Sequence, residues 1–177
     1  MKHLLIMRHG QPEHGGVDYE RTLAPEGEQY VARLGKMLSE RKFNPDIIMS
    51  SPSKRTGETA ELIAGCCGHT RDVDYRQEFY NCTRDTILDG IRALDDSVER
   101  VLVVGHNPSV ESLVSLLCSG NIPGGTWSFR MPAGGLAWIE VESDSWAGTS
   151  QGSCRIFRIV TPENINNECS EARTASV

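Results

Sequence analysis

The sequence predicts a three-layer α/β/α sandwich built around a mostly parallel central sheet. Short apolar runs alternate with helical patterns through the first two thirds of the 177-residue chain, and this alternation is typical of parallel sheets. The predicted strands have no polar side, so we expect helices on both faces of the sheet. In the last third the apolar pattern changes to a period of two, which predicts strands of a different kind at the end of the domain.

The first strand is predicted from the apolar run Lys2–Met7, which stops at Arg8-His9-Gly10. The run is short and apolar throughout, as in a buried strand. Further strands are expected at 45–49, 73–75, 100–104, 127–131, 136–141 and 154–160.

Helices are predicted where apolar residues recur at steps of three and four. They are expected to begin at Pro25, Ser53, Asp85 and Pro108. Serine is a common helix cap, and proline is favoured in the first turn of a helix. Polar, turn-rich segments separate these elements, above all residues 11–24.

Composition limits the partners and the location of the protein. Eighteen basic against 24 acidic residues give a net charge of −6, which argues against a nucleic-acid partner. No apolar run reaches the length of a membrane span or of a signal peptide. We therefore expect a cytoplasmic protein with no membrane partner, with one domain over residues 1–162 and a C-terminal tail over 163–177.

The cysteines are expected to be reduced and structural. They show no CxxC pair and no zinc-ligand spacing. They lie at positions 66, 67, 82, 118, 154 and 169.

Cationic and imidazole side chains follow three of the predicted strands. Arg8 and His9 come after the first strand, Arg55 lies one helical turn beyond the second, and His106 follows the valine-rich run. Ligands of open α/β sheets bind beyond the carboxyl ends of the strands. Two arginines and two histidines there are the composition of a phosphate site.

Other interpretations are weaker. A single histidine after a strand is commonly a loop residue bonded to the backbone, but three strand ends with such groups favour an anion site. A zinc site on His9 and His106 lacks a third ligand. His3, His14 and His69 are expected to be structural.

Arg8-His9-Gly10 after an apolar strand resembles the signature of the histidine phosphatase superfamily, which includes the phosphoglycerate mutases. The pattern is most similar to the small SixA-like phosphohistidine phosphatases and covers residues 2–162. Further segments resemble the family at 21–27, 50–60, 78–81, 103–108 and 131–135.

This resemblance implies a phosphoglycerate mutase-like fold and a two-step phosphoryl transfer that needs no metal and no cofactor. By similarity, His9 is the nucleophile and becomes transiently phosphorylated. Arg8, Arg55 and His106 would hold the phosphoryl oxygens, and Arg21 matches a further phosphate-binding position.

The proton donor is the least defined part of the implied site. Larger family members carry a glutamate between the second and fourth strands, and Glu78 is the candidate by position. Glu13 and Asp18 are alternatives in the segment after His9. Glu78 could equally be an ordinary surface carboxylate.

Two departures from the family pattern bear on the substrate. Gly10-Gln11-Pro12 stands where the small members often have Ala followed by Lys-Ser. Only 50 residues lie between Arg55 and His106, too few for the capping insertion of the mutases. The site should therefore be open to water, which disfavours mutase activity. Gly15, Gly16 and residues 120–125 could form its rim.

The resemblance leaves three functions open. The first is a phosphatase of phosphohistidine on a protein, such as a histidine phosphotransfer domain. The second is a phosphatase of a small phosphate monoester, from a sugar or nucleotide-related metabolite. The third is an inactive phosphate-binding adaptor. Substrate choice depends on loops at the rim, about which a sequence says least.

Overall fold

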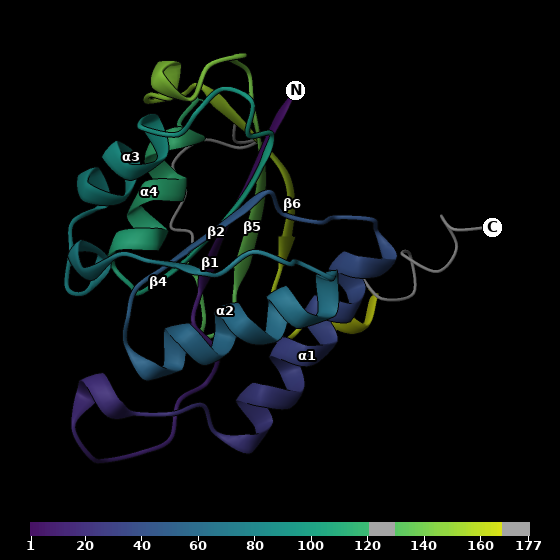
Figure 1. Cartoon of the computed structure of the whole chain (residues 1–177), viewed down its shortest axis with the longest axis vertical. Coiled ribbons are helices and arrows are strands. Elements are labelled where there is room, and N and C mark those ends of the chain that lie inside the picture. The colour runs from purple at the N-terminus through teal and green to yellow at the C-terminus, as the bar shows by residue number, and fades with distance from the viewer. Residues whose placement is uncertain (121–129, 168–177) are drawn as a thin grey trace.

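The computed structural model describes residues 1–120 and 130–167. Within them, six strands form one sheet in the order β3-β2-β4-β1-β5-β6 (Figure 1). The strands are β1 (Lys2–Arg8), β2 (Ile47–Ser50), β3 (Asp74–Tyr75), β4 (Arg100–Gly105), β5 (Leu136–Val141) and β6 (Cys154–Val160). The α-helices are α1 (Pro25–Glu40), α2 (Lys54–Cys67), α3 (Arg84–Arg92) and α4 (Ser109–Leu117), and the short 3-10 turns are η1 (Asp18–Glu20), η2 (Gln77–Phe79) and η3 (Trp146–Gly148).

The sheet is mostly parallel, as predicted. β1 pairs with β4, β4 with β2 and β2 with β3 in parallel. β5 lies antiparallel to both β1 and β6. The period of two in the last third therefore corresponds to an antiparallel extension of a parallel sheet.

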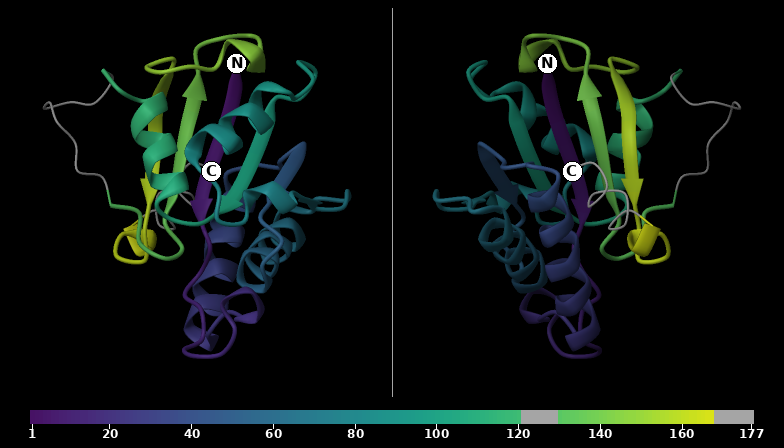
Figure 2. Two further views of the ribbon diagram at one scale, coloured as in Figure 1. Left: turned by 90° about the vertical axis from the view of Figure 1, so that its left-hand side faces the viewer. Right: turned by 90° about the vertical axis from the view of Figure 1, so that its right-hand side faces the viewer.

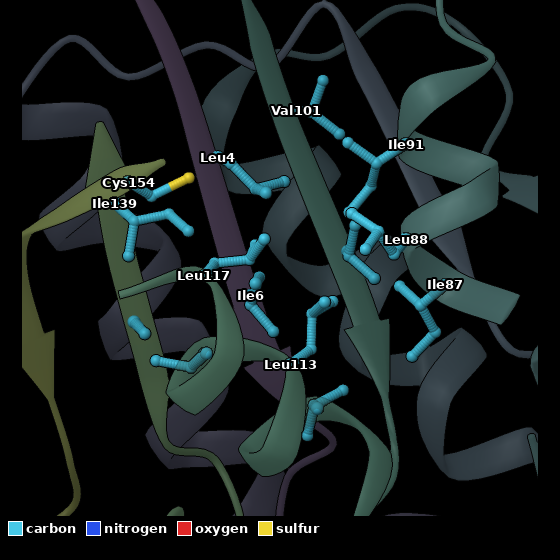
Figure 3. Packing of buried hydrophobic residues seen from close by; sticks show 14 of the residues in the cluster. Leu4, Ile6, Ile87, Leu88, Ile91, Val101, Leu113, Leu117, Ile139 and Cys154 are labelled. Atoms are coloured by element: carbon cyan, nitrogen blue, oxygen red, sulfur yellow. The ribbon is translucent and has the colours of Figure 1, made fainter. Parts of the chain in front are cut away.

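Helices cover both faces of the sheet, which confirms the three-layer prediction (Figure 2). Successive side chains of β1 point to opposite faces, as the pleat of a strand requires. Leu4 and Ile6 join the core beneath α3 and α4 (Figure 3). Leu5 and Met7 join the core beneath α1 and α2. β1 is thus buried on both sides.

The first turn of α1 lies against the chain that leaves β1. A Cβ atom at Gly27 would come within 2.3 Å of the carbonyl oxygen of Gln11, so only glycine permits this approach. The contact brings segment 10–24 beyond the carboxyl ends of β1 and β4 (Figure 2).

The structure differs from the predicted elements near residue 130. Of the strand expected over 127–131, residues 127–129 lie outside the described residues, and Arg130 and Met131 belong to no strand. The Met131 backbone instead bonds to side chains of the neighbouring site. The rim segment 120–125 lies outside the described residues except for Gly120.

Near its start, the tail predicted over residues 163–177 packs against the core of the domain. Ile165 is 1% exposed and belongs to the core beneath α1 and α2. Ile165 therefore packs with the domain, whereas the division of the chain at residue 162 stays a prediction. Residues 168–177, including Cys169, lie outside the described part of the chain.

Two helix starts differ in detail from the expectation. Ser53 occupies the N-cap position of α2 but makes no side-chain cap; its hydroxyl contacts Thr56 Oγ1 at 2.9 Å. Pro108 is the N-cap residue of α4 rather than part of its first turn.

The described cysteines are all free thiols. None of the helices within residues 1–120 and 130–167 has the length and apolar character needed to cross a membrane.

Candidate active site

The carboxyl ends of β1, β2 and β4 meet at a cavity of about 390 Å³. Arg8 ends β1 and His9 directly follows it, Arg55 lies in the first turn of α2 after β2, and His106 directly follows β4. The residues that line the cavity are Arg8, His9, Gln11, Pro12, His14, Asp18, Arg21, Arg55, Asn81, His106, Asn107 and Ala133. Five of the six residues implied by the family resemblance therefore meet here, and Glu78 does not.

The backbone of His9 is held from both sides. Its N–H donates to the Gly105 carbonyl at 3.1 Å, and its own carbonyl accepts from Gly134 N–H at 2.8 Å. The next residue, Gly10, donates its N–H to Thr59 Oγ1 at 3.0 Å. These contacts fix the position from which the His9 ring enters the cavity.

Hydrogen bonds define which ring nitrogen of His9 carries the proton and which does not. Nδ1 lies 2.7 Å from the Gly10 carbonyl oxygen, which can only accept, so Nδ1 carries the proton. Arg55 Nε can only donate, and it lies 3.2 Å from His9 Nε2. Nε2 therefore presents a lone pair, as a nucleophilic imidazole must.

Burial keeps both imidazoles neutral. Burial, together with the charges of Arg55 and Arg8, lowers the pKa of His9 from 6.5 to about 3. Burial and the Arg55 charge lower the pKa of His106 to about 4. The ring centroids lie 5.2 Å apart. Both rings are consequently uncharged at neutral pH.

Arg55 lies between the two imidazoles. Its Nη2 is 3.4 Å from His106 Nδ1, which must accept. His106 Nε2 then carries the proton and donates to Ser51 Oγ at 2.9 Å. Sequence reasoning did not single out Ser51 as a site residue; its position directly after β2 is the signal that could have found it.

Arg8 connects the cavity to a second one. Its Nη1 donates to the Met131 carbonyl at 3.1 Å, and its buried Nε has no partner among the described residues. Asn107 donates to the same carbonyl at 2.9 Å and to Glu111 at 3.1 Å. Arg8 and Asn107 also line a neighbouring cavity of about 720 Å³.

An acidic residue lies among the cations. The Asp18 carboxylate accepts from Arg55 Nη2 at 3.0 Å and from the Tyr80 hydroxyl at 2.8 Å. It also pairs with Arg21. The Arg21 guanidinium and the Tyr80 hydroxyl hold the pKa of this carboxyl well below its usual range. Asp18 is therefore ionised, and the sequence did not indicate its contact with Arg55 or the role of Tyr80.

Among the candidate proton donors, only Asp18 lines the cavity. Glu78 lies away from it, with its side chain 53% exposed and 3.8 Å from Arg76. Asn81, from the same segment, lines the cavity instead. Glu13 is exposed. The donor role of Glu78 stays a prediction.

The arrangement is suited to anion chemistry. Three guanidinium groups, those of Arg8, Arg21 and Arg55, line the same cavity as a neutral imidazole whose unprotonated Nε2 accepts a hydrogen bond from Arg55. Guanidinium groups bind phosphoryl oxygens in a planar, bidentate manner. Over residues 1–120 and 130–167, no group of three His, Cys, Asp or Glu residues is placed to hold a metal ion.

Comparison with known proteins gives a consistent fold. The family model of the histidine phosphatase superfamily (branch 1) matches residues 4–83. The structure of the protein histidine phosphatase SixA complexed with tungstate superposes with a TM-score of 0.78 at 23% identity, over 92% of this chain and 99% of that one. Phosphoserine phosphatase from Entamoeba histolytica, in complex with 3-phosphoglyceric acid, gives a TM-score of 0.64 at 17% identity, over 93% and 100%. An uncharacterised protein of Mycobacterium tuberculosis is 25% identical over 162 residues, or 88% of this chain and 99% of the relative.

Proposed function

We propose that the chain is a member of the histidine phosphatase superfamily, whose family model matches residues 4–83, and that it works as a phosphatase without a metal ion, through a covalent intermediate on His9. The observation that carries this proposal is the protonation pattern of His9. With the proton held on Nδ1 by the Gly10 carbonyl, Nε2 is the unprotonated nitrogen; its lone pair accepts from Arg55 Nε in the free protein and would leave that bond to attack phosphorus.

In the first step, His9 Nε2 forms a bond to phosphorus, and the bond from phosphorus to the leaving group breaks. The leaving group departs with the bonding electron pair and takes up a proton. Arg8, Arg55 and His106 would hold the three equatorial oxygens, and Arg21 would add positive charge at the rim. Phosphoryl transfer depends chiefly on such positioning and charge stabilisation.

In the second step, water attacks the phosphorus of phospho-His9. The P–Nε2 bond breaks, its electron pair returns to the imidazole, and the water gives up a proton as inorganic phosphate forms. The Gly10 carbonyl oxygen accepts a hydrogen bond from His9 Nδ1–H, and this bond would support the positive charge that the ring bears while phosphorylated.

The substrate that we favour is phosphohistidine on a protein, such as a histidine phosphotransfer domain. Between Arg55 and His106 the chain forms the rest of α2, then β3, η2, α3 and β4, and this stretch carries no capping domain. An imidazole leaving group also makes little demand on a proton donor, in keeping with the position of Glu78 outside the cavity.

A small phosphate monoester is the second candidate. The neighbouring cavity of about 720 Å³ shares Arg8 and Asn107 with the reaction centre. Its size falls within the range of small-ligand pockets, about 300–1,000 Å³. It could hold the alcohol part of an ester while the phosphoryl group lies at His9.

Turnover and intact-mass measurements test the proposal. The purified protein, with EDTA present, is given a phosphohistidine-bearing phosphotransfer domain and then a panel of phosphate monoesters. We expect phosphate release and a transient mass increase of one phosphoryl group. His9→Asn should abolish both, whereas His14→Gln, which removes an exposed histidine of the same cavity, should retain the phosphorylated species.

The alternatives give different results. Turnover of esters alone would keep the chemistry and change the substrate class. Phosphate binding without turnover of anything would indicate an adaptor. Activity that survives His9→Asn, or that EDTA abolishes and a divalent cation restores, would overturn the proposed mechanism.

A further inference from the structure

Arg55 is the buried cation of the candidate active site, and its hydrogen-bonding groups are already engaged. The residue is 5% exposed. Nε donates to His9, Nη1 donates to the backbone carbonyl of Asp18, and Nη2 contacts both the Asp18 carboxylate and His106. The outward edge of the guanidinium, where a phosphoryl oxygen would bind, is thus occupied by Asp18.

Asp18 cannot remain in this position when a phosphoryl group binds. Both are anions that require the same Nη2 donor, and like charges at such a distance repel. The carboxylate does not relieve this repulsion by taking up a proton at neutral pH, because Arg21 and Tyr80 stabilise its ionised form. The carboxylate must therefore move off Arg55.

The segment that carries Asp18 is fixed at its base and unsupported near its tip. Glu13 N–H donates to Thr22 O, and Ala24 N–H donates to Gln11 O, both at 2.9 Å. Gly15 and Gly16 have positive φ values of 78° and 75°, and no atom lies within 4 Å of a Cβ built on either. The side chain of Asp18 is itself 50% exposed, so its movement is opposed chiefly by its polar contacts with Arg21, Arg55 and Tyr80.

We propose that Asp18 is an internal competitor of the phosphoryl group: it fills the phosphate-binding edge of Arg55 in the free protein, lowers the affinity for oxyanions, and by returning to Arg55 helps to release the phosphate product. This inference rests on the proposed function for the identity of the anion. A carboxylate offers Arg55 one partner, whereas a phosphoryl group can engage Arg8, Arg55 and His106 together, so a phosphorylated substrate can displace Asp18.

A purely structural role of Asp18 predicts the opposite change in phosphate affinity when its carboxylate is removed. If Asp18 served to orient Arg55 and Arg21, its removal would misplace both and weaken phosphate binding. If it competes with phosphate, its removal should strengthen binding. The direction of the change in affinity therefore decides between the two.

The test measures the dissociation constant of inorganic phosphate by titration calorimetry, without turnover. Asp18→Asn should bind phosphate about 10-fold more tightly or better, as expected for losing a competing charge-assisted hydrogen bond. Glu20→Gln is the matched control. It removes one negative charge from the same turn, from a side chain that lies 3.9 Å from Lys54 and outside the cavity, and should change the constant less than two-fold.

A second variant tests the same idea without a change of charge. Tyr80→Phe removes the hydroxyl that donates to Asp18 at 2.8 Å and should tighten phosphate binding about two- to five-fold. Under turnover, Asp18→Asn should also be more strongly inhibited by added phosphate. Unchanged or weaker phosphate binding in Asp18→Asn, or equal tightening in Glu20→Gln, would overturn the inference.

Failure of this inference is distinguishable from failure of the proposed function. Normal turnover with unchanged phosphate affinity in Asp18→Asn would refute the role of Asp18 as a competitor and leave the proposed phosphatase function intact. Tighter phosphate binding by Asp18→Asn, in a protein that turns over no substrate, would refute the phosphatase function and leave the role of Asp18 as a competitor.

Discussion

The two buried imidazoles should make the stability of the protein depend on pH in a defined window. The folded-state pKa values of His9 and His106, about 3 and about 4, lie below the ordinary value of 6.5. The folded protein therefore binds fewer protons than the unfolded chain once the pH falls below 6.5. Stability is fully present above that pH and is lost as the pH falls towards the folded-state values.

The size of the effect follows from the proton linkage. Each proton bound only by the unfolded chain lowers the free energy of unfolding by about 1.4 kcal/mol per pH unit. From pH 6.5 to about 4.5, each histidine should cost about 2 kcal/mol and the pair about 4 kcal/mol. Asp18 and Asp46, whose pKa values are lowered from 3.8, lose their contribution only at lower pH.

Urea unfolding followed by tryptophan fluorescence measures this, because Trp146 and Trp138 are 0% and 7% exposed. The comparison is between the wild type and His9→Asn/His106→Gln, whose amides can keep the contacts with Gly10 and Ser51. The difference removes the contribution of His3, whose pKa burial also lowers. Equal pH dependence of the two proteins over this window would show that the imidazoles are not buried and neutral.

Three further perturbations probe the site and the fold. Arg55→Lys keeps the charge but loses the planar fork and should lower kcat/KM about 10²-fold, while Lys54→Arg next to it should not; equal effects would argue against the fork. If Glu78 protonates the leaving group, Glu78→Gln should lower kcat about 10²-fold for a phosphate ester and less for phosphohistidine; an unchanged ester rate would leave Glu78 only as a partner of Arg76. Gly27→Ala should cost at least about 2 kcal/mol in urea unfolding, because its Cβ would meet backbone at 2.3 Å. Gly65→Ala, in open space within α2, should instead stabilise by about 0.5–1 kcal/mol, and similar effects of the two would contradict the packing at Gln11.

The sequence predicts the sheet and the meeting of the cationic groups because both follow from local patterns. The apolar runs that form β1, β2 and β4 are continuous, and the parallel pairing of these strands brings their carboxyl ends to one edge. His9, Arg55 and His106 lie together for that reason, although they are far apart in the chain. The antiparallel direction of β5 against β1 depends on a connection whose course has no comparable signal.

Side-chain direction is what the sequence could not supply. Glu78 and Asn81 belong to one short segment, yet Asn81 lines the cavity and Glu78 turns to Arg76. From the sequence, Asp18 is a candidate only for a proton donor, since nothing in its neighbours indicates a contact with a residue 37 positions away. The direction of these side chains is set by charge pairs, such as that of Asp18 with Arg55, which the periodicity of the sequence does not reveal.

The paired ends of segment 13–22 make it an exchangeable module. Because Glu13 and Thr22 already lie side by side, a foreign segment of similar or greater length can be inserted between them at a small cost in loop-closure entropy. His9, Arg55 and His106 are carried by other parts of the chain, so their backbone positions would be kept while the contacts of Arg55 with Asp18 changed. Altered substrate preference can therefore be sought by grafting in this one place, and grafts that retain or omit Asp18 would differ in how readily they release phosphate.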